Sequence, residues 1–308
     1  MPRFTPPTVR PLIGLGFLLL AIGFAAFQWA SRSPLSEASS QKTLRLAVTD
    51  VEGMEALQRE FGAFRDRLTE QTGIPMEFFP VSDRTAAVEA LASGQIDLVI
   101  TGPAEYVIFR SRTHVQPVVG FSRPNYLATI SVRKDSGITS LAQLRGKKVA
   151  LGDIGSTSKH LGPLKLLIDA GVRANEFTPV HTSIQAGWEA LQSKDVEAFA
   201  TTSDKIDLLR EKTKDHATDI LARSGQLPMD VLLAAEMVPA DVLGKIRAAF
   251  KADSEALVKA ILQGNDNQKY AGMSFSAEIQ DSDYDLVREM FVASGLEHLA
   301  TVQQAGQK

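Results

Sequence analysis

Three consecutive hydroxyl residues follow a glycine turn in the sequence GDIGSTSKHLGP, residues 152–163. The short apolar run KVAL precedes this segment, and a helix-like stretch follows it. A tight glycine turn at the start of a helix exposes several backbone N–H groups, which Ser156, Thr157 and Ser158 supplement with hydroxyls. Such an array of dipoles binds an anion without a net positive charge. The segment therefore predicts a site for a tetrahedral oxyanion, although an ordinary N-capped helix after a strand is the alternative interpretation.

Catalytic chemistry is a weaker interpretation of these residues. Ser158 and His160 are two positions apart, so they would point in different directions on a helix, and no GxSxG motif is present. The five histidines show no metal-ligand spacing, and the chain has no cysteine for a thiolate nucleophile, a disulfide or a metal site. Asp97 and Glu197 stand at the starts of strands and are expected to be structural. The sequence thus predicts a binding protein that needs no cofactor or metal and is not an enzyme.

The elements that must position this loop follow an α/β pattern. Residues 43–49 alternate apolar and polar side chains, as a strand does, and residues 54–72 carry apolar side chains at helical spacing before Gly73. A second strand, a helix at 84–93 and a strand at 96–100 come next. This order favours a mostly parallel sheet flanked by helices.

The segments 86–102 and 186–202 align without gaps, and six residues are identical between AAVEALASGQIDLVITG and AGWEALQSKDVEAFATT. Chance similarity between two short amphipathic units is one explanation. The other is that two α/β lobes use the same helix–turn–strand unit and face each other across a hinged cleft. Each strand would then end at a threonine, Thr101 or Thr201, at the carboxyl edge where open sheets bind ligands. Thr101 is accordingly a candidate ligand contact.

The N-terminus predicts export. An uncharged apolar run within residues 11–30 follows Arg3 and Arg10, and it has the length of a membrane-spanning helix. It reads as an uncleaved anchor or a cleaved signal peptide. With a net charge of only −3 and scattered basic residues, the chain is not expected to bind nucleic acid. The expected organisation is a signal anchor or signal peptide (1–30), a tether (31–42), lobe 1 (43–131 and 234–308) and lobe 2 (132–233).

Several motifs between residue 43 and about residue 235 resemble one known family, the phosphate/phosphite/phosphonate-binding subunits of ABC importers. The motifs are GQID at 94–97, GPAEYV at 102–107, KDSGI at 134–138, SLAQLRGK at 140–147, and GD at 152–153 with STS at 156–158. The resemblance implies the two-lobed type II periplasmic-binding-protein fold, α/β in both lobes. It also implies a periplasmic monomer, tethered or free, that captures a small phosphorus oxyanion and presents it to an ABC permease. A membrane-tethered sensory or scaffold protein of the same fold is the alternative function.

The resemblance also assigns site residues. Ser156, Thr157 and Ser158 match the cradle that grips the phosphonyl oxygens, and Tyr126 matches a tyrosine that contacts the ligand in relatives. Arg84 stands where relatives carry a tyrosine and Ile184 where they carry a histidine. Arg84 is therefore a candidate bidentate clamp on the anion, and a solvated arginine at the start of a helix is its alternative role. Two acidic residues, Asp204 and Asp230, match positions that hold an amino group in aminophosphonate binders. A helix N-cap for Asp204 and a turn for Asp230 are the alternative roles.

Overall fold

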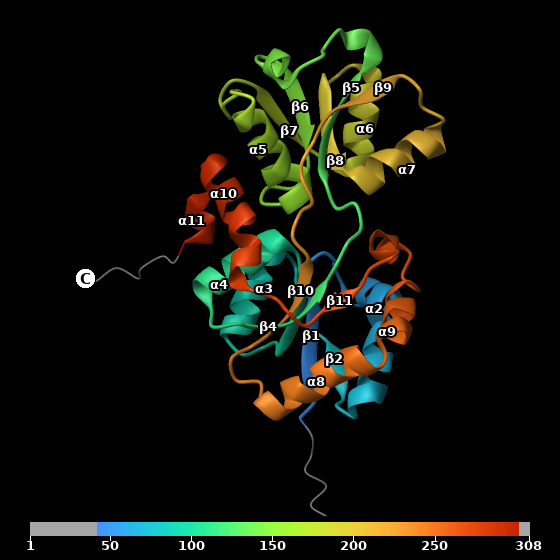
Figure 1. The fold of residues 1–308 in the computed structure, drawn as a ribbon, viewed down its shortest axis with the longest axis vertical. Helices are drawn as coiled ribbons and strands as arrows, with labels where there is room; N and C mark the ends of the chain where they lie inside the picture. The colour runs from blue at the N-terminus through green and yellow to red at the C-terminus, as the bar shows by residue number, and fades with distance from the viewer. Residues whose placement is uncertain (1–41, 302–308) are drawn as a thin grey trace, which may run out of the picture. The chain divides into compact units, whose positions relative to one another are not determined.

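The computed structural model describes residues 42–301, without the side chains of Arg84 and Thr85. Two sheets organise this part of the chain (Figure 1). Within the described range, no helix combines the length and the apolar character needed to cross a membrane. The apolar segment at 11–30 and nearly all of the expected tether lie outside the described residues, so the predicted anchor stays a prediction.

The first sheet has six strands and forms lobe 1. In spatial order they are β11 (Phe275–Ser276), β4 (Gln116–Phe121), β10 (Asp230–Ala234), β3 (Leu98–Thr101), β1 (Leu44–Val48) and β2 (Met76–Phe78). The second sheet has five strands and forms lobe 2. In spatial order they are β7 (Thr178–His181), β6 (Lys148–Leu151), β8 (Ala198–Thr202), β5 (Ala128–Arg133) and β9 (Thr218–Arg223).

The two sheets share one arrangement, because the order β10-β3-β1-β2 in lobe 1 corresponds to β5-β8-β6-β7 in lobe 2. In each sheet the last three of these strands run parallel, and the first runs antiparallel to its neighbour. The sheets are therefore mixed, because the strands that enter from the other lobe pair in the opposite direction. The repeated units occupy equivalent places in the two lobes, which explains the internal sequence similarity.

Helices cover both sheets. Those of lobe 1 are α2 (Met54–Thr72), α3 (Arg84–Ala92), α4 (Pro103–Arg112), α8 (Ala240–Ala252), α9 (Ser254–Ile261), η4 (Asp266–Tyr270), η5 (Asp281–Tyr284), α10 (Asp285–Ala293) and α11 (Glu297–Ala300). Those of lobe 2 are η1 (Lys134–Ser136), η2 (Leu141–Leu144), the π-helix η3 (Thr157–Leu161), α5 (Gly162–Asp169), α6 (Ile184–Ser193) and α7 (Ser203–Thr213).

Local sequence signals explain several helix ends. Gly73 closes α2 in the left-handed conformation (φ 67°), which glycine adopts without strain. Asp83 and Ser183 cap the equivalent helices α3 and α6 by accepting hydrogen bonds from Ala86 N–H and Ala186 N–H.

The helices α8 and α9 are separated only by Asp253. The chain leaves the helical conformation at Asp253, whose carboxylate accepts hydrogen bonds from Arg67 and Gln71 of α2. This break depends on a contact between segments far apart in sequence, so periodicity alone does not reveal it.

The connections between the lobes run through residues 122–127 and 224–229. Strand β5 pairs along its whole length with β8 and β9, and β10 pairs wholly with β3 and β4. The expected lobe limits at 131/132 and 233/234 would cut through these two strands, because the strand-like pattern does not show which sheet a strand joins.

Buried apolar side chains form one large cluster in lobe 1 and two clusters on the faces of the second sheet. Leu161 of η3 belongs to the lobe 1 cluster, so the apolar core continues into the glycine-turn segment of lobe 2. Helix α10 packs against α4 and also against α5 and η3. The C-terminal helix α10 therefore contacts both lobes.

Candidate ligand-binding cleft

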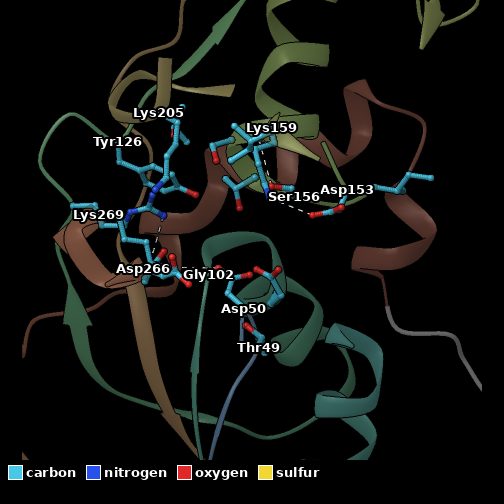
Figure 2. A pocket seen from close by; sticks show the side chains of 18 of the residues that line it. Thr49, Asp50, Gly102, Tyr126, Asp153, Ser156, Lys159, Lys205, Asp266 and Lys269 are labelled. Carbon is cyan, nitrogen blue, oxygen red and sulfur yellow. Dashed lines mark hydrogen bonds and ion pairs between the residues drawn. The ribbon is translucent and has the colours of Figure 1, made fainter. Parts of the chain in front are cut away.

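A cavity of about 610 Å³ lies where the carboxyl ends of the parallel strands of both sheets meet. Thr49 and Gly102 follow β1 and β3 in lobe 1, and Asp153 and Thr202 stand at the ends of β6 and β8 in lobe 2. In Figure 2, Thr49, Asp50 and Gly102 lie on one wall, and Ser156 and Lys159 lie across from them. The cavity therefore lies at the carboxyl edges of the two sheets, where the repeated helix–strand units predicted a ligand site.

The cavity wall is strongly charged. Among the described side chains that line it, the acidic ones are Asp50, Glu52, Asp83, Glu105, Asp153, Asp230 and Asp266, and the basic ones are Arg123, Lys159, Lys205 and Lys269. Ion pairs between lining residues neutralise part of this charge: Lys159 with Asp153 at 3.2 Å, Lys269 with Asp50 at 3.5 Å, and Arg123 with Asp230 at 3.6 Å.

The glycine-turn segment supplies the lobe 2 wall. Ser156 caps η3, and Leu161 N–H donates to the Ser156 carbonyl over the wide spacing of a π-turn. The side chains of Ser156, Thr157 and Ser158 are all buried and all line the cavity. Gly152 is required at the turn, since a Cβ there would lie 2.5 Å from Lys159 Cβ. The segment thus presents three side-chain hydroxyls to the cavity at the start of a helix.

Thr157 also joins the two lobes. Its Oγ1 accepts a hydrogen bond from Ala104 N–H, in the first turn of α4, at 2.9 Å. This bond is buried, and it uses the hydroxyl as an acceptor. The Thr157 proton therefore remains available to donate to a bound anion.

Arg123 is the most deeply placed cation of the cavity. Its guanidinium lies 3.7 Å from the centroid of the Tyr126 ring, and its NH1 is 3.6 Å from Asp230 Oδ2. Burial by itself would lower the pKa of Arg123, but Asp230 and nearby phenols more than offset this, so the pKa is raised. Tyr270 donates to Asp230 Oδ2 at 2.7 Å. A permanently charged group thus stands at the junction between the lobes.

Tyr126 is 5 % exposed and lines the cavity beside the hydroxyl segment. Burial raises its pKa to about 12, and a hydrogen bond with Ser158 acts in the opposite direction. The phenol is therefore neutral at ordinary pH and acts as a hydrogen-bonding group, not as a charge.

The predicted site residues fall into three groups. Ser156, Thr157, Ser158, Tyr126 and Asp230 all line the cavity. Thr101 is not among the lining residues, because its hydroxyl bonds at 3.0 Å to that of Thr49, which lies in front of it. Asp204 is also absent from the wall, although the next residue, Lys205, is present. The side chain of Arg84 is outside what the structure describes, so its role as a clamp stays a prediction.

Several lining residues had no sequence signal. Arg123 precedes Tyr126 by three positions in the crossing segment and sits in no motif. Lys269 comes from η4, which reaches the cavity because the buried Glu60 of α2 accepts from Asp266 N–H. Only packing between distant segments brings these two cations to the cleft.

The histidines do not form a catalytic site. His160 is buried, accepts from Gly155 N–H on Nδ1 and has its ring 5.1 Å from that of His181. His181 Nδ1 bonds to the Gly152 carbonyl at 2.8 Å, so both rings support the glycine turn from behind. Within the described range, no cluster of potential metal ligands is present.

The two acidic residues at strand starts are structural, as expected. Asp97 is buried and pairs with Arg45, and Glu197 accepts a hydrogen bond from Lys148 N–H.

Comparison with known proteins gives a consistent result. The family model described as "ABC transporter, phosphonate, periplasmic substrate-binding protein" matches residues 46–284. The phosphate-import protein PhnD of Mycolicibacterium smegmatis is 26% identical over 282 residues, which is 83% of this chain and 87% of that protein.

Two solved structures share the fold. PhnD1 of Prochlorococcus marinus in complex with methylphosphonate matches with a TM-score of 0.66 and 18% identity, over 83% of this chain and 99% of the other. A binding protein component of an ABC phosphonate transporter from Pseudomonas aeruginosa matches with a TM-score of 0.64 and 19% identity, over 87% and 91%.

Proposed function

The chain belongs to the family of periplasmic substrate-binding proteins of phosphonate ABC transporters, and we propose that its cleft captures a small phosphorus oxyanion. A member of this family is a binding component of an importer and not an enzyme. Ligand specificity is the part that the cleft itself must explain. The relatives include a phosphate-import protein and a structure bound to methylphosphonate, and both ligands carry the same phosphoryl head group.

One observation carries the proposal: the hydroxyl segment and the Arg123 guanidinium line the same cavity. Ser156, Thr157 and Ser158 provide neutral donors at a helix N-terminus, and Arg123 provides a buried positive charge. Hydrogen bonds from a cation to an oxyanion are shorter and stronger than neutral ones. The anion would therefore sit between the lobe 2 hydroxyls and the crossing segment, in contact with Tyr126.

Binding between the lobes explains how capture is coupled to closure. The Thr157–Ala104 bond already links lobe 2 to the first turn of α4. A ligand that contacts both walls adds interactions only when the lobes are together, so it shifts the hinge equilibrium toward the closed state. The closed form is the one to be delivered to the permease. No contact among residues 42–301 favours the alternative role as a sensory or scaffold protein.

The apolar segment at 11–30 extends the proposal to location. The family is periplasmic, and this segment would hold the protein at the outer face of the inner membrane, as a monomer beside its permease. Cell fractionation tests the tether. Release into the osmotic-shock fluid would show that the segment is cleaved instead.

Isothermal titration calorimetry on the purified chain tests the function. Phosphate, phosphite, methylphosphonate and 2-aminoethylphosphonate form the panel. We expect at least one of them to bind in the titration and to raise the melting temperature of the protein in a separate thermal denaturation. If none of them binds, the proposed function is wrong.

A further inference from the structure

The C-terminal helices lie beside the joint between the two lobes, away from the ligand cavity. We call residues 281–300, which comprise η5, α10 and α11, the C-terminal strap. In Figure 1, α10 and α11 lie beside α4 of lobe 1, and α10 also lies beside α5 of lobe 2. None of residues 281–300, all of which the structure describes, lines the ligand cavity. The strap is therefore placed to act on the arrangement of the lobes and not on the ligand.

Lobe 1 holds the start of the strap through aromatic and charged contacts. The Tyr284 ring stacks on the Tyr106 ring of α4 with the centroids 3.8 Å apart, and both residues are fully buried. The Tyr106 hydroxyl donates to Asp281 at 2.8 Å. Asp281 also accepts from Arg110 of α4 at 3.3 Å and from Arg288 of α10 at 2.8 Å. A buried aromatic stack with charge-assisted hydrogen bonds at its edge fixes the strap to α4.

The strap also contacts the hinge. The Tyr284 hydroxyl donates to the Met229 carbonyl at 3.1 Å, at the end of the second crossing segment and directly before β10. Tyr284 also lines a cavity of about 350 Å³ together with residues of both crossing segments. Because α4 and β10 both belong to lobe 1, the strap must move with lobe 1 when the lobes separate.

The contacts of the strap with lobe 2 are apolar. Met290 is 2 % exposed, and its Cε lies 4.0 Å from the position that a Cβ on Gly162 would occupy. Gly162 begins α5 directly after η3, and α10 packs against both elements. Leu299 of α11 and Ile154 of the glycine turn line the same small cavity of about 90 Å³. The strap thus presents an apolar face to the segment that carries the cleft hydroxyls.

Opening of the cleft must break these apolar contacts. The hydrogen bond between Thr157 and Ala104 shows that η3 lies against lobe 1 in this structure. Separation of the lobes would move η3 and α5 away from lobe 1 and therefore away from the strap. It would expose Met290 and Leu161, which are only 2 % and 0 % exposed here, and exposure of apolar surface to water is unfavourable.

We propose that the C-terminal strap holds the two lobes in the closed arrangement before any ligand binds. The proposed function assigns closure to the contacts of the ligand, whereas the strap adds a contribution that is present without one. A protein that is already largely closed loses little affinity to the cost of closing, because its binding-competent state is well populated. The proposal does not depend on which anion the cleft takes.

Distance measurements on the ligand-free, full-length chain test the proposal. The chain has no cysteine, so Ser93→Cys and Ser193→Cys place one nitroxide spin label on each lobe. Both positions are exposed and stand at the C-terminal ends of the equivalent helices α3 and α6. Double electron–electron resonance then gives the populations with short and with long distances between the lobes. In this labelled reference protein we expect the closed population to exceed the open one without ligand.

Two substitutions in the labelled protein weaken the contact between the strap and lobe 2. Met290→Ala should raise the ratio of open to closed molecules about tenfold and Leu299→Ala about threefold, since the contacts removed stabilise only the closed arrangement. Val292→Ala is the matched control, because Val292 lies on α10 with 66 % of its side chain exposed, and it should leave the ratio unchanged. Far-UV circular dichroism checks that the variants fold. If Met290→Ala does not fold, Leu299→Ala decides by itself.

The outcomes separate this inference from the proposed function. A reference protein that is mainly open without ligand overturns the inference, and so does an unchanged ratio in the substituted proteins. An equal change in Val292→Ala also overturns it, because the effect would then not come from the contact with lobe 2. No ligand is used in these measurements. Failure of every phosphorus oxyanion to bind would therefore refute the proposed function and leave the role of the strap intact.

Discussion

Protonation of His160 should destabilise the protein as the pH falls. The ring is buried behind the glycine turn, and Gly155 N–H donates to its Nδ1, so the proton of the neutral ring is on Nε2. Burial, and then the nearby His181, lowers the pKa of His160 from 6.5 to about 4. A protonated ring would have to give up the bond from Gly155, because Nδ1 would then carry a proton.

The magnitude follows from linkage. Between about pH 6.5 and pH 4 the unfolded chain binds a proton at this residue and the folded chain does not, so stability decreases as the pH falls through this range. Lowering the pKa from 6.5 to about 4 corresponds to about 3 kcal/mol of lost unfolding free energy, complete below the folded-state pKa. Since small proteins are stable by about 5–15 kcal/mol, this single residue should have a visible effect.

Urea denaturation at pH 7.5 and pH 4.5 measures the effect. His160→Asn should remove much of the pH dependence, since the amide oxygen can accept from Gly155 N–H and does not titrate. His216→Asn is the control, because His216 is exposed and should leave the pH dependence as in the wild type. If the wild type and His160→Asn lose the same free energy between the two pH values, the reasoning is refuted.

Three further substitutions test the cleft and its scaffold. Thr157→Ala should weaken binding of the phosphorus oxyanion by about 1–3 kcal/mol in calorimetry, and an unchanged Kd would remove this hydroxyl from the site. Gly152→Ala should lower the melting temperature through a destabilisation of about 1–3 kcal/mol, whereas Gly225→Ala, where a Cβ meets nothing within 4 Å, should not. Arg123→Met should lower the free energy of unfolding, measured by urea denaturation, by roughly 3 kcal/mol, because it leaves the Asp230 carboxylate buried without a positive charge beside it. Adding Asp230→Asn should recover part of that loss.

Local patterns predicted most elements of the fold. The apolar spacing of α2, its closing glycine and the alternation in β1 come from interactions within a few residues, which the sequence records directly. The repeated helix–strand units also proved informative. Because each unit must fit an equivalent place in its sheet, a similar sequence was retained at both places, and the two strands lie at corresponding positions. The hydroxyl segment could be identified from the sequence because its three hydroxyl residues, Ser156, Thr157 and Ser158, are consecutive.

The charged half of the site was not predictable in this way. Arg123 and Lys269 come from a crossing segment and a short C-terminal helix, and nothing local distinguishes them from solvated cations. For Thr101 and Asp204 the local signal was misleading. The strand end predicted Thr101 and the family match predicted Asp204 as ligand contacts, but Thr49 and Lys205 line the cavity in their place. Which of two neighbouring side chains faces a cavity depends on the packing around it, and this packing involves distant parts of the chain.

The sequence by itself therefore determined the α/β class, the similar helix–strand units of the two lobes, the hydroxyl segment that lines the cavity, and the family to which the chain belongs. Hydrogen bonds and periodicity within short segments fix these features, and short segments keep their signals wherever the fold places them. Only the tertiary structure decided that Arg123, Tyr126, Tyr270 and Asp230 meet beneath that segment. Arg123 and Tyr126 come from the first crossing segment, Asp230 from the start of β10, and Tyr270 from η4, more than a hundred residues after Arg123. This long-range packing places at one cavity Arg123 Nε and Asp230 Oδ1, which have no hydrogen-bond partner among the described residues.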